Sequence, residues 1–206
     1  MPLQNRVTPL GEVIADPSRG LVYGNRGCLH DRAGTIRRHH QVRRWIGCRL
    51  EFKGRRRTPL VRPGHYTPLF FLDEATAFAA GHRPCTECRR PDYVRFGELW
   101  RALHPDDKGA EAIDSRLHAQ RWDGAGQRHH TAPYADLPDG TVVLRGGEPW
   151  LVVGPRLRRW TPEGYTEVAA RPARGAATVV TPPSLVAVLR SGWEAQVPLL
   201  HPSAGD

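Results

Sequence analysis

Apolar and polar residues alternate over short stretches of this chain, which predicts short strands in several places. In residues 44–52, the apolar side of an extended chain would carry Ile46, Cys48, Leu50 and Phe52. Residues 69–72 form a second short apolar strand. From Gly140 onward, three apolar stretches follow one another, with a Gly-Gly pair between the first two. This pattern predicts an antiparallel meander with a hairpin turn at the glycines.

Helix signals lie between and after these strands. Asp73 is placed to cap a helix over residues 74–80, and Gly81 supplies its end. A second helix begins at Pro91, and its apolar face would be formed by Tyr93, Phe96, Trp100 and Leu103. Further helices are predicted over residues 109–121 and 183–190.

These elements predict an α+β fold in two parts. A basic N-terminal lobe, residues 1–125, would hold short strands and two or three helices. A small C-terminal lobe, residues 138–206, would hold the antiparallel β-strands. The segment between them is a loop with Gly and His residues, and the alternative is one continuous domain.

Charge is distributed unevenly along the chain. Residues 1–90 contain 17 Lys and Arg against 7 Asp and Glu, a net of +10, whereas residues 91–206 have a net of −1. Nearly all the basic residues are arginines, which suit bidentate contact with phosphate. We therefore expect DNA or RNA as a partner, and the alternative is a solvated basic face or an acidic protein partner. The predicted nucleic-acid contacts are Arg26, Arg37, Arg38, Arg43, Arg44, Arg55, Arg56 and Arg57.

No apolar run is long enough to span a membrane, and the N-terminal residues contain no apolar signal core. A cytoplasmic location is therefore expected. The four cysteines are then expected to be reduced, because the cytosol disfavours disulfides.

The pair Cys85-x-x-Cys88 is the most specific chemical signal in the sequence. Two thiolates at this spacing on a tight turn can bind one tetrahedral ion, so we expect a structural zinc site. Cys28 and Cys48 are the expected remaining ligands. The rivals for the fourth position are His30, His65 and His82.

The stretch FFLDEATAFAAGHRPCTECRRPDY, residues 70–93, resembles the metal-binding domain of the adaptive-response (Ada) DNA alkylation-repair proteins. The resemblance covers about residues 69–93 and implies Cys85 and Cys88 as two of four cysteine ligands of zinc. It also implies a link to DNA repair, in which one zinc-bound cysteine accepts a methyl group from a DNA phosphotriester. That family's first ligand pair is Cys-x-x-x-Cys, whereas here 19 residues separate Cys28 from Cys48. By position, Cys28 or Cys48 would be the acceptor.

A second group of residues could support hydrolysis. Asp114 and His118 are spaced i,i+4 on a predicted helix and so share one face, with His129 and His130 downstream. Such a group could act as general base and metal ligand in a nuclease. The alternative is an ion pair on a helix surface, and the His39-His40 pair is expected to belong to the basic surface.

The sequence therefore predicts a zinc-binding, nucleic-acid-binding protein connected with DNA repair or processing. The alternatives are a nucleic-acid-processing enzyme, acting by methyl acceptance or hydrolysis, and a protein-interaction module. Neither a catalytic role nor its absence is predicted for the chain as a whole.

Overall fold

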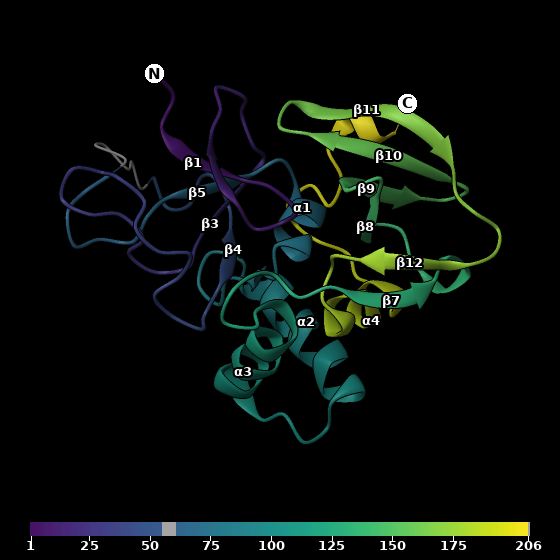
Figure 1. Ribbon diagram of the computed structural model, residues 1–206. Helices are drawn as coiled ribbons and strands as arrows, with labels where there is room; N and C mark the ends of the chain where they lie inside the picture. The colour runs from purple at the N-terminus through teal and green to yellow at the C-terminus, as the bar shows by residue number, and fades with distance from the viewer. Residues whose placement is uncertain (55–60, 206) are drawn as a thin grey trace.

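The computed structural model of the protein describes residues 1–54 and 61–205 (Figure 1). In this part of the chain, two sheets and four α-helices form an α+β fold, which confirms the predicted class. Figure 1 shows the N-terminal sheet and the C-terminal sheet on either side of helix α1, with α2 and α3 below them.

The N-terminal sheet has six short strands in the order β2-β1-β5-β3-β4-β6. The pairs β1–β5 and β4–β6 are parallel, and the other neighbours are antiparallel. The strands are β1 (Gln4–Val7), β2 (Val13–Ala15), β3 (Val22–Asn25), β4 (Ile46–Cys48), β5 (Leu69–Phe71) and β6 (Arg83–Pro84).

The C-terminal sheet is antiparallel throughout, in the order β11-β10-β9-β8-β12-β7. The predicted Gly-Gly turn is present between β8 and β9, where Gly146 and Gly147 both have positive φ. Strand β7 lies in the segment expected to be a loop, and it pairs with β12. The strands are β7 (His130–Pro133), β8 (Val142–Arg145), β9 (Glu148–Val153), β10 (Arg156–Thr161), β11 (Gly164–Ala170) and β12 (Ala176–Val179).

The helices follow the predicted ranges closely. They are α1 (Glu74–Ala79), α2 (Arg90–Leu103), α3 (Gly109–Arg121) and α4 (Pro183–Arg190), with short 3-10 turns at Tyr134–Asp136 and Pro202–Ala204. None of the helices in the described residues is long and apolar enough to cross a membrane.

Helix α1 is buried along its whole length and packs against both sheets. Its N-terminus is capped by Asp73, whose carboxylate accepts a hydrogen bond from the Thr76 amide at 2.8 Å. Ala75 and Ala79 contact the core of the C-terminal sheet, whereas Ala77 and Ala80 contact that of the N-terminal sheet. The division into two lobes stays a prediction, and α1 contributes to the core on both sides.

The predicted strand over residues 44–52 is shorter than its alternating pattern. Only Ile46–Cys48 is paired, between β3 and β6. Beyond Cys48 the chain leaves the sheet, and Leu50 is 46% exposed. Alternation therefore located the strand and the burial of Cys48, but it did not define where pairing stops.

Candidate metal centre

Three of the four cysteines meet at one end of the N-terminal sheet. The sulfur atoms of Cys48, Cys85 and Cys88 all lie within 4.8 Å of one another. Cys48 is the last residue of β4, Cys85 follows β6, and Cys88 lies just before α2. All three are buried, with apolar neighbours that include Tyr23 and Phe70.

Strand pairing brings Cys48 to the Cys85-x-x-Cys88 turn. Strands β4 and β6 run parallel, with Gly47 opposite Pro84. The ladder continues one step further, because the Cys85 amide donates to the Gly47 carbonyl at 2.9 Å. The two chain segments therefore end side by side, each with a cysteine at its end.

The three cysteine side chains form hydrogen bonds with one another, and these bonds shift the pKa values of the thiols in opposite directions. Hydrogen bonds from Cys48 and Cys88 hold the pKa of Cys85 well below its usual value. Hydrogen bonds with Cys85 and Cys88, together with burial, raise the pKa of Cys48. A divalent cation would replace the shared protons, since thiolates are the metal-binding form of cysteine. Three clustered sulfur atoms fit a soft tetrahedral ion such as zinc.

Buried ion pairs hold the frame around the cysteines. Arg83 donates to both oxygens of Asp114 on α3, at 2.9 and 2.7 Å. Arg89 pairs with Glu74 at 2.5 Å and with Asp92 at 2.6 Å, which joins α1 to the start of α2. These arginines are therefore engaged by carboxylates, and only Arg90 of the flanking arginines is exposed.

Cys28, a predicted fourth ligand, lies outside the three-sulfur group. Its sulfur contacts the His30 carbonyl at 3.6 Å, and its amide donates to Gln41 at 2.7 Å. The register of β3 and β4 explains this placement. Tyr23 lies opposite Cys48 and Asn25 opposite Ile46, so the chain runs away from Cys48 as it approaches Cys28.

The rival histidines are also engaged elsewhere. His30 contacts the Thr67 hydroxyl through Nδ1 at 2.5 Å, and its Nε2 lies 3.1 Å from the Arg62 carbonyl. His65 is exposed, and His82 is buried against Phe71. Within the described ranges, no fourth Cys, His, Asp or Glu ligand atom joins the three sulfurs.

Asp114 and His118 contact different partners in the structure. Both oxygens of Asp114 are taken by Arg83, so this carboxylate is unavailable as a free base. His118 instead lies against His40, with ring centroids 4.9 Å apart. Of the downstream histidines, His130 is the first residue of β7 and His129 precedes that strand.

Some of the arginines predicted to contact nucleic acid are exposed, and one of them is buried. Arg37, Arg38, Arg43 and Arg44 are exposed. Arg26 is fully buried, which corrects its assignment as a nucleic-acid contact. Its guanidinium donates to the Gly11 carbonyl at 2.9 Å and lies over the Trp45 ring, so it cannot reach an external phosphate from that position. Arg55, Arg56 and Arg57 lie outside the described residues.

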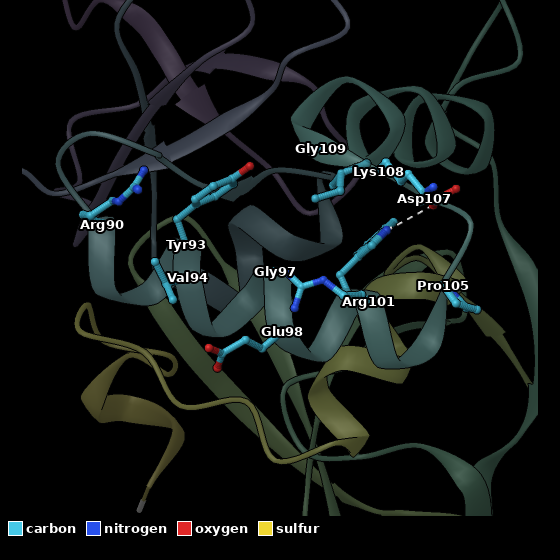
Figure 2. A pocket seen from close by; sticks show the side chains of 12 residues that line it. Arg90, Tyr93, Val94, Gly97, Glu98, Arg101, Pro105, Asp107, Lys108 and Gly109 are labelled. Atoms are coloured by element: carbon cyan, nitrogen blue, oxygen red, sulfur yellow. Dashed lines mark hydrogen bonds between the residues drawn. The ribbon is translucent and has the colours of Figure 1, made fainter.

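A groove of about 470 Å³ runs along α2 and the start of α3 (Figure 2). Arg90 and Tyr93 line it at the N-terminal end of α2, which follows Cys88 directly. Figure 2 shows Arg101 and Lys108 further along it. The groove carries both basic and acidic side chains, the latter being Glu98 and Asp107, and it starts next to the cysteine group in the chain.

Comparison with known proteins identifies no relative for this chain. No protein family, no curated protein and no solved structure matches it. The resemblance of residues 69–93 to the alkylation-repair proteins therefore stays a prediction, and the function has to be argued from the site itself.

Proposed function

We propose that the protein binds one zinc ion through Cys48, Cys85 and Cys88 and binds nucleic acid through its exposed arginines. The observation that carries the first part is the meeting of three cysteine sulfurs within 4.8 Å. A redox pair needs only two cysteines, whereas a third sulfur at the same point is the donor set of a metal site. A zinc ion there would tie β4, the β6 end and the start of α2 together.

Surface charge supports the nucleic-acid part. Arg38, Arg43 and Arg44 are exposed, and no salt bridge within residues 1–54 and 61–205 engages them. Arg37 is 63% exposed and pairs with Asp31 at 2.8 Å. Unpaired arginine side chains close together in the chain are suited to phosphate contact, which releases counterions on binding.

Metal analysis tests the first part. We expect about one zinc per chain in the purified protein and a loss of it in the Cys48→Ser, Cys85→Ser and Cys88→Ser variants. Cys28→Ser is the matched control, because its sulfur lies outside the group. A parent protein without metal, or an equal loss in Cys28→Ser, would refute the assignment.

The salt dependence of binding tests the second part. The logarithm of the affinity for an oligonucleotide should fall linearly with the logarithm of salt concentration. Arg43→Gln and Arg44→Gln should each reduce the slope by about 1. Arg156→Gln, an exposed arginine on β10, should leave the slope unchanged. An affinity of the parent protein that does not change with salt concentration would exclude phosphate contact as the basis of binding.

Methyl acceptance is a second candidate, favoured by three thiolates at one ion. Such a centre would carry a net negative charge, which keeps a zinc-bound sulfur nucleophilic. The sulfur would bond the methyl carbon while the carbon–oxygen bond of the phosphotriester breaks and leaves a phosphodiester anion. Of the two acceptors predicted by position, only Cys48 belongs to the group. Peptide mass analysis after exposure to methylated DNA should then show one methyl on a cluster cysteine, and unmodified peptides would exclude this reaction.

A further inference from the structure

Two buried arginines face the ring of the same tryptophan. Arg26 is fully buried and Arg121 is 1% exposed. Their guanidinium carbons lie 4.5 and 4.0 Å from the centroid of the same Trp45 ring. In the part of the chain that the structure describes, neither forms a salt bridge. The buried arginines Arg83 and Arg89, in contrast, are both paired with carboxylates.

Backbone carbonyls accept hydrogen bonds from only some of the guanidinium N–H groups of these arginines. Arg121 donates to the carbonyls of Gly81 and Arg43, and Arg26 donates to that of Gly11. Nη2 of Arg26 and Nε of Arg121 are buried without a hydrogen-bond partner. Burial lowers the pKa of Arg26 to about 9. Burial also lowers the pKa of Arg121 well below its usual value, although the nearby Asp114 carboxylate opposes the shift. A bound anion would supply the missing charge.

Two histidine rings lie beside the Trp45 ring that the arginines share. His40, His118 and Trp122 are each partly exposed. The ring centroids of His40 lie 4.9 Å from His118 and 5.3 Å from Trp122. Nδ1 of His40 and Nδ1 of His118 are buried and unpartnered. The exposed Arg43 is close enough to affect His118 electrostatically, so positive charge is present at the surface as well as in the interior.

These rings do not form a metal site in this arrangement. Among the described residues, the ligand atoms of His39, His40 and His118 do not come together within 4.8 Å. Burial, followed by the charges of Arg121 and Arg26, lowers the pKa of His40. Burial is also the largest cause that lowers the pKa of His118 to about 4, followed by the charges of Arg121, His40 and Arg43. Each ring is therefore neutral near pH 7 and offers one N–H donor.

We propose that His40, His118 and Arg121, with Arg43 at the surface, form a binding site for a phosphate group, to which Arg26 contributes positive charge from the interior without contacting the anion. Uncompensated arginines and neutral histidine donors match a dianion with several acceptor oxygens better than a single carboxylate. The partly exposed Trp122 ring provides a surface beside the site on which a nucleobase could stack. The site goes beyond the proposed function, because a free phosphate compound and a nucleic-acid backbone would both present this group.

Titration with inorganic phosphate tests the site. At constant ionic strength, with chloride as the reference, phosphate should bind saturably and shift the ring NMR signals of His40 and His118 but not that of the exposed His65. His118→Gln should weaken phosphate binding by about tenfold, and His65→Gln should not change it. His118 is only partly buried, so this variant should fold, which circular dichroism would verify. The absence of saturable binding, or full affinity in His118→Gln, would overturn the proposal.

Two further probes identify the source of the phosphate. A nucleoside monophosphate that binds, alongside an oligonucleotide that does not, would support the site and refute nucleic-acid binding. An oligonucleotide that binds and is displaced by inorganic phosphate would support both. An oligonucleotide that binds through Arg43 and Arg44, with no effect of phosphate or of His118→Gln, would preserve the proposed function and refute the phosphate site.

Discussion

Arg83 and Asp114 form a bidentate ion pair in the interior of the protein. Nε and Nη2 of the arginine lie 2.9 and 2.7 Å from the two carboxylate oxygens. Arg83 belongs to β6, which leads to Cys85, and Asp114 belongs to α3. The pair therefore joins the helix that carries His118 to the strand that positions the cysteines.

Replacement of Asp114 by Asn should destabilise the protein by about 3–5 kcal/mol. The variant would leave the Arg83 charge buried without its counter-ion, since both side chains are at most 8% exposed. Chemical denaturation gives the free energy of unfolding. Glu111→Gln is the matched control, because it changes an exposed acid on the same helix and should cost less than about 0.5 kcal/mol. Equal stability of the two variants would show that the pair contributes nothing.

Removal of metal should lower thermal stability. An ion at a free concentration a thousand times its Kd stabilises the folded state by about 4 kcal/mol, which for a chain of this size corresponds to roughly 8–16 °C in Tm. Thermal unfolding with and without a chelator measures the change, and added zinc should restore the original Tm. Cys85→Ser should respond to neither treatment. A chelator-independent Tm in the parent protein would contradict a stabilising ion.

Gly81→Ala should destabilise the fold by about 2–5 kcal/mol. Gly81 has a φ of +81°, and a methyl group there would meet the Arg121 Cδ at 2.3 Å. The same substitution at Gly97, within α2, meets nothing within 4 Å and should be neutral or stabilising by up to about 1 kcal/mol. Denaturant titration of both variants separates local strain from a general effect of alanine. Equal effects would show that the Arg121 side chain yields easily.

The protonation of His118 should make the protein less stable as the pH falls. Burial is the largest cause that lowers its pKa to about 4, whereas the unfolded value is near 6.5. Between these values the unfolded state binds a proton that the folded state does not, so stability is present above pH 6.5 and declines toward pH 4. Relative to the parent protein, His118→Gln should therefore gain stability as the pH falls through this window. His65→Gln provides the comparison. NMR titration that gives His118 a pKa above 6.5 would reverse the expectation.

The sequence by itself determined features that depend on interactions within a few residues. These are the Asp73 cap and Gly81 stop of α1, the burial of Phe96 and Trp100 on α2, the hairpin at Gly146 and the Cys85-x-x-Cys88 turn. Leu103, predicted on the same apolar face of α2, is exposed. The α+β class follows from these local features, because alternating and helical patterns lie in separate segments. Each of these rests on backbone geometry and side-chain spacing that a short peptide already contains.

Only the tertiary structure decided which distant residues meet. The register of β3, β4 and β6 brings Cys48 to the cysteine turn and carries Cys28 away from it. Burial of Arg26 moves a predicted surface residue into the interior, and His40 reaches His118 across the fold. The physical reason is that local patterns state which side of an element is apolar, whereas strand register and helix packing decide what that side faces.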